Sequence, residues 1–382
     1  MKPLILISGL ASGGAERITV SFLRHLREHD EAVPLCTVTA RQDGPLAQEL
    51  EKAGVVRFDL GARRLADPLA LMRLLTLVRR QRFDLVHAHG QDAAVLAHWV
   101  RRLVPFRLVI TRHVMEEPMA DWRRRLRARA ACAAIRRADA VVAVSHAIAQ
   151  KLVELSGRPR EAIHVIENGI ELERFADGSP TVRQRVRESL GVSFSEPLVL
   201  VPAALRDGKG HEVLLRALPA LLTRVPEVRV LFAGAGEREA VLKREARSVG
   251  DAVSFLGLRT DIPELMSACD LVVLPSTTRS DGTVEEALPT VLIEAAAAGR
   301  AVVATRLSGT PEIVVDGRTG LLVPPSDPIA LAGAIATLLI DGDRARAYGA
   351  AAHEVAHERF AVVKQITHTV ALWRRVLGEN GS

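Results

Sequence analysis

The sequence predicts an α/β protein made of two doubly wound domains, each built around a parallel sheet. Short apolar runs alternate with amphipathic stretches along the chain, and the alternation restarts after the polar segment "FADGSPTVRQRVRESLGVSFSEP". At 382 residues the chain is long enough for two domains that each bury a core. We therefore expect an N-terminal domain over residues 1–180, a C-terminal domain over 181–359, and a last helix at about 360–382 that packs back on the first domain.

In the first half, short apolar runs have the length of buried strands. A helix is expected from Ala15 to His29, because Ile18, Phe22 and Leu26 recur every four residues. The strand candidates are "PLILIS", "AVPLCTV", "VVRFDL", "FDLVHA", "RLVIT", "AVVAVS" and "AIHVI".

In the second half the same pattern returns, with the strand candidates "LVLVPA", "VRVLFAG", "AVSFLG", "LVVLP", "AVVAT" and "GLLVP". Strands that alternate with helices favour parallel sheets, which bind ligands beyond the carboxyl ends of their strands. With two such domains we expect the active site in the cleft between them.

Composition limits the class of protein. The chain is 48% hydrophobic and 25% charged, as soluble globular proteins are, and its opening "MKPLILISGL" is too short an apolar run for a signal peptide. No apolar run reaches the length of a membrane span, so we expect a cytoplasmic protein. Cys36, Cys132 and Cys269 are far apart and odd in number, which predicts reduced core residues without a disulfide or metal framework.

The charge is unevenly distributed. Residues 1–180 carry 28 Lys and Arg against 21 Asp and Glu, whereas the remaining residues carry 23 against 24. Residues 101–137 hold 11 arginines, and "DWRRRLRARAACAAIRR" predicts a basic helix. This helix is either a solvated face or a contact with an anionic substrate or with anionic lipid at the inner face of the cell membrane. Nucleic acid is not expected as a partner, because aromatic residues make up only 3% of the chain.

A glycine loop, "SGLASGGAER" at residues 8–17, follows the first strand and opens a helix, as a phosphate-binding loop does. It matches neither GxGxxG nor GxxxxGK[ST], and the second strand ends in "TVTARQ" without the acidic residue that holds a nicotinamide ribose. A dinucleotide dehydrogenase is therefore disfavoured. The second glycine turn, "GAGERE", is by itself typical of any turn.

Two histidine patterns raise the question of a metal. "HEVAH" at residues 353–357 has zincin spacing but lacks the downstream glycine and third histidine, so a chance match is favoured. His87, His89 and His113 lie at the ends of two neighbouring strand candidates and predict either a metal site or a polar rim of an active site. The absence of carboxylates at suitable spacing favours the rim, and we expect no metal site.

The most specific motif is a pair of glutamates separated by seven residues, Glu286 and Glu294, in "EALPTVLIEAAAAGRAVVAT". In this context the chain resembles the retaining glycosyltransferases of family 4, which have the GT-B fold and use nucleotide sugars. The resemblance covers nearly the whole chain, through "GGAER", "HAHG", "ADAVVAVS", "ENGIELERF", "LRDGKGHEVLLRA", "SFLGLRTDIPELMSACDLVVLPS" and "GTPEIVVDGRTGLLVPPSDP".

The resemblance implies roles for the residues around this motif. Glu294 would bind the ribose hydroxyls of the donor, and Glu286 would lie near the transferred sugar. Thr290 and Val291 would offer backbone N–H groups at a helix start to the diphosphate, and Pro289 can begin that helix because it has no N–H to offer.

Lys209, in "DGKGH", matches the family lysine that contacts the donor phosphates and offsets charge on the leaving nucleotide. The family usually carries an arginine five or six residues earlier, where this chain has Ala203 and Ala204. Arg206 is the candidate to replace it.

The remaining expectations also follow from the resemblance. His113 would reach the transferred sugar, and with Lys209 and Glu286 it completes the expected catalytic set. "GLRTD" at residues 257–261 matches the loop that holds the base. The further expected contacts with the donor are Gly13, Gly14, Leu258, Arg259 and Leu288.

The resemblance implies a retaining hexosyl transfer from a nucleotide-diphosphate sugar to a hydroxyl acceptor, in the synthesis of cell-envelope polysaccharide, lipopolysaccharide or glycolipid. A UDP-sugar is expected rather than a GDP-sugar, with no metal and no other cofactor. The acceptor stays open among glycans, lipid-linked molecules and small molecules. The alternatives are a nucleotide-sugar epimerase or hydrolase on the same fold, a glycosyltransferase of a natural-product pathway, and a non-catalytic binding subunit.

Overall fold

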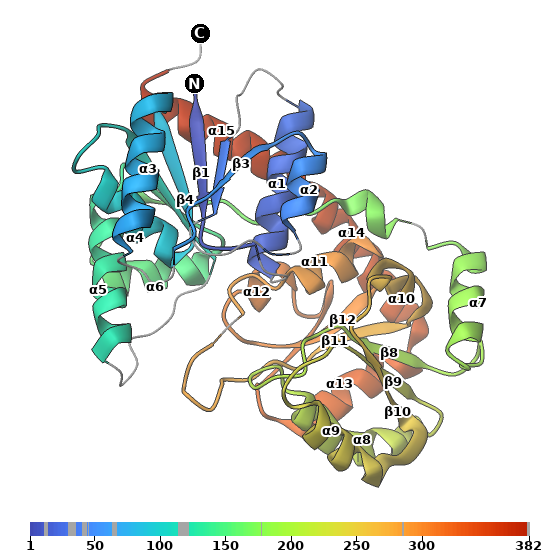
Figure 1. Ribbon diagram of the computed structural model, residues 1–382. Coiled ribbons are helices and arrows are strands. Elements are labelled where there is room, and N and C mark those ends of the chain that lie inside the picture. The colour runs from blue at the N-terminus through green and yellow to red at the C-terminus, as the bar shows by residue number, and fades with distance from the viewer. Residues whose placement is uncertain are drawn as a thin grey trace. The chain divides into compact units, whose positions relative to one another are not determined.

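The computed structural model (Figure 1) divides into two units. The first comprises Met1–Gly169 with Val362–Ser382, and the second comprises Ile170–Ala361. The structure describes residues 1–10, 14–29, 36–39, 44, 46–62, 67–113, 122–176, 178–284 and 286–379, without the side chains of residues 15, 29, 36–39, 123 and 124.

The first unit contains a parallel sheet of seven strands: β1 (Pro3–Ile7), β2 (Cys36–Thr39), β3 (Val56–Asp59), β4 (Leu85–His89), β5 (Arg107–Arg112), β6 (Ala140–Ala143) and β7 (Ile163–Val165). Their order in the sheet is β3-β2-β1-β4-β5-β6-β7. β1 and β4 are parallel neighbours, with Ile7 opposite His89. The strands β1 to β3 follow one another toward one edge of the sheet and β4 to β7 toward the other, so the switch point of the strand order lies between β1 and β4.

Helices cover both faces of this sheet (Figure 1). On one side α3, α4, α5 and α6 follow one another, and on the other α1 packs against α2 and α15. Their bounds are α1 (Gly14–His29), α2 (Ala47–Lys52), α3 (Pro68–Gln81), α4 (Gln91–Val100), α5 (Trp122–Arg137), α6 (His146–Ser156) and α15 (Val362–Leu377), with a 3-10 turn η1 (Arg160–Ala162).

The second unit contains a parallel sheet of six strands: β8 (Leu198–Val201), β9 (Arg229–Ala233), β10 (Val253–Gly257), β11 (Leu271–Leu274), β12 (Ala301–Thr305) and β13 (Gly320–Val323). The order is β10-β9-β8-β11-β12-β13, so the reversal here falls between β8 and β11. In a doubly wound sheet, the loops that leave the two strands at this point diverge and open a crevice for ligands.

The helices of the second unit pack on this sheet and on one another, α8 against α13 and α11 against α14. Their bounds are η2 (Leu172–Phe175), α7 (Pro180–Ser189), α8 (His211–Arg224), α9 (Glu239–Glu245), η3 (Ala246–Ala252), α10 (Ile262–Ala268), α11 (Thr290–Ala297), α12 (Thr310–Ile313), α13 (Pro328–Ile340) and α14 (Gly342–Arg359).

The two crossings between the units lie at Gly169 and Val362. Residues 172–175 pack against α10 and α11, which explains why the second unit begins at Ile170 and not at the expected position 181. After α14 the chain returns, and Ile366 and Trp373 of α15 join the apolar core of the first unit. All thirteen expected strands and the helix expected at Ala15–His29 are present, within a few residues of the predicted bounds.

Candidate functional site

The loops that follow β8 and β11 meet through an ion pair. Lys209, after β8, places its Nζ 2.6 Å from Oε1 of Glu286, which follows β11. The lysine side chain is 13% exposed and the glutamate side chain 7%. A carboxylate buried to this extent requires a cation or several hydrogen-bond donors. The sequence motifs "DGKGH" and "EALPT" thus meet at the switch point of the second sheet.

One hydroxyl group fixes Glu286 directly, and a second fixes the residue that carries the first. Ser276 donates from its Oγ to Glu286 Oε1 at 2.7 Å, and Thr305, the last residue of β12, donates from Oγ1 to the Ser276 carbonyl oxygen at 2.7 Å. Neither hydroxyl was predicted from the sequence. The available signal was position, since each is among the first polar residues at the carboxyl end of a buried apolar strand.

Two glycines allow the loops to approach so closely. A Cβ at Gly210 would lie 1.8 Å from the Pro275 carbonyl oxygen, and one at Gly309 would lie 1.9 Å from that of Ala287. Gly210 also has φ +69°, which favours glycine. The backbone N–H of Gly309 donates to the Glu286 carbonyl oxygen at 3.1 Å. Larger residues at either glycine would separate the loops that hold Glu286.

The start of α11 lies directly after Glu286. Pro289 precedes the helix, and its first turn, which begins with Thr290 and Val291, has no acidic residue and no side-chain cap. Glu294 lies one turn further on and is half-buried, and Leu288 is buried. A helix start of this kind attracts anions, because its first N–H groups point outward and the helix dipole is positive there.

Arg206 lies in the same turn as Lys209, whose backbone N–H donates to the Arg206 carbonyl oxygen at 3.3 Å. The arginine side chain is exposed. Beside it, Asp207 accepts hydrogen bonds from the hydroxyl and backbone N–H of Ser280, which lower the pKa of that carboxyl. The turn is therefore anchored next to Arg206, and the candidate for the missing family arginine remains a prediction.

The loop after β10 carries the residues expected near a base. Leu258 is 79% exposed. Arg259 donates from Nε and Nη2 to the two carboxylate oxygens of Asp261 at 2.7 and 2.5 Å. These hydrogen bonds raise the pKa of Arg259 and lower that of Asp261. The guanidinium is thus held by its neighbour, and Leu258 is the apolar side chain that this loop presents to solvent.

In the first unit, the three histidines come together at the ends of β4 and β5. Trp373 of α15 donates from Nε1 to His87 Nδ1 at 3.1 Å. Since indole N–H can only donate, Nδ1 of His87 is an acceptor, and Nε2 carries the proton and donates to Thr111 Oγ1 at 2.7 Å. The sequence did not predict this contact, because Trp373 lies 286 residues along the chain from His87.

The other two histidines contact each other, with His89 Nδ1 3.2 Å from His113 Nε2. Burial, reinforced by the charge of Arg112, lowers the pKa of His113 to about 4. Burial also lowers the pKa of His87 to about 3 and that of His89 well below its usual range. All three rings are therefore neutral near pH 7, where each has one nitrogen that donates and one that accepts a hydrogen bond.

The glycine loop of the first unit is described only in part. Gly14 is the first residue of α1, and a Cβ built there would meet no atom within 4 Å. Gly13 lies outside the described residues.

The "HEVAH" histidines lie on α14, and their ring centroids are 4.4 Å apart. His353 Nδ1 lies 2.8 Å from the carbonyl oxygen of Ala297, at the end of α11, so this histidine joins two packed helices. In the part of the chain that the structure describes, no group of three or more His, Cys, Asp or Glu side chains is arranged to hold a metal ion.

The Lys209–Glu286 pair should contribute to stability. Lys209→Ala would leave Glu286 buried without its cation, which is expected to lower the free energy of unfolding by on the order of 3 kcal/mol. Adding Glu286→Gln should recover part of this loss, because an amide needs no opposite charge. Urea unfolding measures both. Lys243→Ala removes the exposed pair with Glu239 and is the control, expected to cost about 0.5 kcal/mol or less. A double variant that is no more stable than Lys209→Ala would contradict the role of the pair.

The neutral histidines should make the first unit sensitive to acid. Because the folded pKa of His113 is about 4 and the unfolded value about 6.5, the unfolded state binds more protons between these values. The contribution of these neutral histidines to the free energy of unfolding is fully present above about pH 6.5. It falls as the pH drops toward about 4, by roughly 1.4 kcal/mol per pH unit for each such histidine. His113→Gln should reduce this slope in urea unfolding series, whereas the exposed His368→Gln should not. An unchanged slope in His113→Gln would refute the assignment.

Comparisons with known proteins identify the family and the fold. A family model described as Glycosyltransferase Family 4 matches residues 12–174, and one described as Glycosyl transferases group 1 matches residues 196–341. The chain is 32% identical to the GDP-mannose-dependent alpha-(1-6)-phosphatidylinositol monomannoside mannosyltransferase of Mycolicibacterium smegmatis, over 75% of each chain. It is 30% identical to the D-inositol 3-phosphate glycosyltransferase of Corynebacterium urealyticum, over 69% of this chain and 64% of that protein.

Among solved structures, HepE of Anabaena in complex with UDP-glucose superposes with a TM-score of 0.83 at 27% identity, covering 98% of this chain and 100% of HepE. The fold and the family expected from the sequence are thereby confirmed. The chain belongs to the group 1, family 4 glycosyltransferases, enzymes of the GT-B fold that use nucleotide sugars.

Proposed function

We propose that this protein transfers a hexosyl group, with retention of anomeric configuration, from a UDP-sugar to a hydroxyl group of a cell-envelope glycan or glycolipid. The observation that carries the proposal is the buried Lys209–Glu286 pair at the switch point of the second sheet, directly before the uncapped start of α11. It combines a cation, a fixed carboxylate and outward N–H groups at one edge of a sheet.

The donor diphosphate would bind at this edge. Its negative charge would compete with Glu286 for the Lys209 ammonium. Its phosphate oxygens would accept hydrogen bonds from the backbone N–H groups of Thr290 and Val291. Glu294, one turn along the helix, would accept hydrogen bonds from the ribose hydroxyls. The protein would thus stabilise the charge that develops on the leaving nucleotide.

In the transfer step, the acceptor oxygen would attack the anomeric carbon on the face from which the nucleotide leaves. The bond from that carbon to the phosphate oxygen breaks, and the departing oxygen takes the proton of the acceptor hydroxyl, so atoms and charge balance. Glu286 is fixed by Ser276 and Lys209 and is assigned to hold sugar hydroxyls. His113, neutral and at the end of β5, is assigned to a hydroxyl of the same sugar.

The nucleotide of the donor is proposed to be UDP. The proposal is supported by HepE, which superposes on this chain and is bound to UDP-glucose, while the sequence relative at 32% identity is named for GDP-mannose. Both kinds of donor occur among the relatives, so the binding experiment below includes both.

A donor-binding experiment tests this function. Glu294→Ala is expected to weaken the binding of UDP at least tenfold, because hydrogen bonds to a charged acceptor are worth about 1.5–3 kcal/mol. Calorimetry with UDP and with GDP measures the effect and identifies the base. Glu354→Ala, which changes the exposed glutamate of "HEVAH", is the matched control and should bind as the unmodified protein does.

Product analysis completes the test. With a panel of UDP-sugars and a hydroxyl acceptor, the product should keep the anomeric configuration of the donor, as read by NMR. Release of free sugar alone would instead indicate a hydrolase, and equal UDP affinity in Glu294→Ala would remove Glu294 from the site.

The first unit is proposed to reach its acceptor at an anionic membrane surface. None of the described helices is long and apolar enough to cross a membrane. On α5, however, Trp122 is 66% exposed and Leu126 is 60% exposed, and their spacing places them on one face of an arginine-rich helix. Exposed Trp and Leu beside arginines are typical of helices that lie in the membrane interface. Arg127 does not belong to this surface, because it pairs with Asp92 at 2.7 Å.

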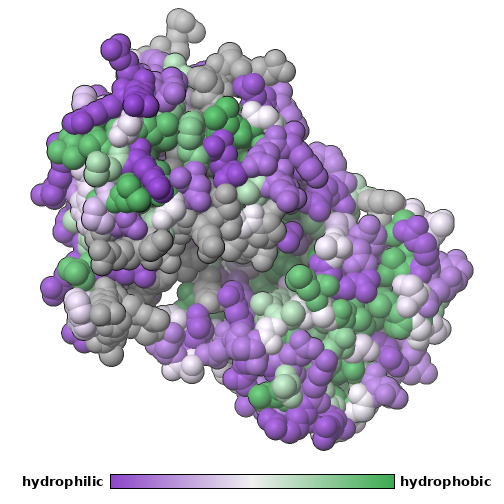
Figure 2. All heavy atoms as spheres, viewed as in Figure 1, coloured by the Kyte–Doolittle hydropathy of each residue, from purple (hydrophilic) through white to green (hydrophobic). Residues whose placement is uncertain are grey.

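Vesicle binding tests this proposal. The unmodified protein should co-sediment with vesicles that contain phosphatidylglycerol and not with neutral vesicles, and added salt should release it. Changing both Trp122 and Leu126 to Ser should abolish the binding. The matched control changes Leu69 and Met72, which are exposed on α3 where Figure 2 shows hydrophobic side chains gathering. If the control variant loses vesicle binding equally, exposed apolar side chains in general cause the binding and α5 has no special role. If the unmodified protein binds neither vesicle type, docking on an anionic membrane is excluded.

A further inference from the structure

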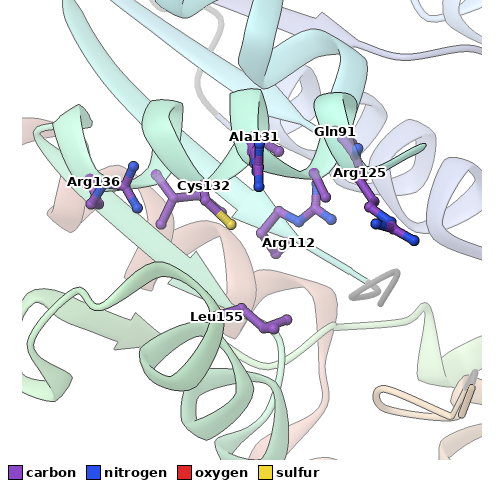
Figure 3. Close-up of a pocket in the computed structure, with 10 residues that line it drawn as sticks. Gln91, Arg112, Arg125, Ala131, Cys132, Arg136 and Leu155 are labelled. Carbon is purple, nitrogen blue, oxygen red and sulfur yellow. The ribbon is translucent and has the colours of Figure 1, made fainter. Parts of the chain in front are cut away.

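The first unit contains a pocket of about 330 Å³ beside α5 (Figure 3). Its size is at the lower end of the range of about 300–1,000 Å³ for small-molecule sites. The lining side chains come from α5, from the first residue of α4, from the end of β5 and from α6. Four of them are arginines: Arg112, Arg125, Arg129 and Arg136. Among the described residues that line the pocket there is no carboxylate.

The arginines are brought together by regular geometry. Arg125, Arg129 and Arg136 lie on one face of α5 together with Cys132, because they recur at intervals of three and four residues. Arg112, the last residue of β5, reaches the same pocket, and Figure 3 shows its side chain beside Cys132. Leu155 of α6 lies on the opposite side (Figure 3).

Charge indicates what the pocket is built for. Arg112 is only 3% exposed, so its guanidinium is largely withdrawn from water, and its charge contributes to the lowered pKa of His113. Four guanidinium groups around one small cavity repel one another, and an anion bound in the cavity would lower that repulsion.

We propose that this pocket binds a phosphate group carried by the acceptor. Guanidinium groups bind phosphate through pairs of parallel N–H donors, and several of them together favour a phosphate monoester or diphosphate over a neutral sugar. Gln91, which also lines the pocket, adds an amide that can donate to a phosphate oxygen. That the phosphate belongs to the acceptor rests on the proposed transferase activity, whereas the phosphate site itself does not depend on that activity.

Cys132 provides a local readout of occupancy. Its thiol is half-buried and lines the pocket, whereas Cys269 is fully buried and burial raises its pKa to about 12. Alkylation by N-ethylmaleimide, followed at Cys132 by peptide mass mapping, should be slowed by glycerol phosphate and by pyrophosphate, and not by glycerol. Saturating UDP is present throughout, so that the probes do not compete for the donor site.

Variants identify the residues responsible. Arg129→Ala should raise the phosphate concentration needed for protection by about tenfold or more, the loss expected for a hydrogen-bonded charge pair. Arg112→Gln should do the same if it folds, and Arg129→Ala keeps the test valid if it does not. Arg137→Ala, on the same helix outside the pocket lining, is the control and should leave protection unchanged.

Two further arms separate the possible outcomes. If the phosphate is part of a lipid headgroup, vesicles with phosphatidic acid should protect Cys132 while soluble phosphates at equal concentration protect less. Arg129→Ala should raise the KM for a phosphate-bearing acceptor without changing UDP affinity. Absence of protection by every phosphate probe would overturn the pocket assignment and leave the sugar transfer standing. Protection without any sugar transfer would overturn the proposed function and leave the phosphate site standing.

Discussion

The contact on which the second unit depends is the buried pair between Lys209 and Glu286. The two residues lie in loops that leave neighbouring parallel strands, β8 and β11, and the parallel pairing brings both loops to the same edge of the sheet. A carboxylate at this depth is stable only with its cation and with the Ser276 hydroxyl, and the loops approach closely enough only because position 210 has no side chain. The close approach of the two loops and the proposed chemistry therefore depend on the same residues.

Much of this arrangement could be predicted from the sequence, because its signals are local. Buried parallel strands appear as short apolar runs, and the spacing of Glu286 and Glu294 around a proline identifies a loop that becomes a helix. Contacts between distant segments have no such signal. Ser276 was missed although it directly follows the strand and its proline, and Trp373 was missed because its partner His87 lies at the far end of the chain.

Short motifs were less informative than strand ends. "HEVAH" has the helical spacing that places two histidines together, yet His353 contacts a backbone carbonyl oxygen of the neighbouring helix. His87 and His89 lie within β4, His113 directly follows the neighbouring strand β5, and His89 contacts His113. What the sequence could not supply is their protonation, since burial keeps them neutral and the indole of Trp373 determines which nitrogen of His87 carries the proton.

The excess charge of the first half also acquires meaning only in the structure. Arg127 and Arg101 each pair with an aspartate, so these two arginines are engaged within the unit, while the net balance of residues 1–180 is unchanged by the pairing. Part of the remaining charge surrounds one pocket, where Arg112 directly precedes His113 in the chain and lowers its pKa. An anion bound in that pocket would offset the field of Arg112, so the pKa of His113 would rise while burial still kept it below its usual value. Binding of a phosphate and the proton affinity of this histidine are therefore linked, and each must favour the other.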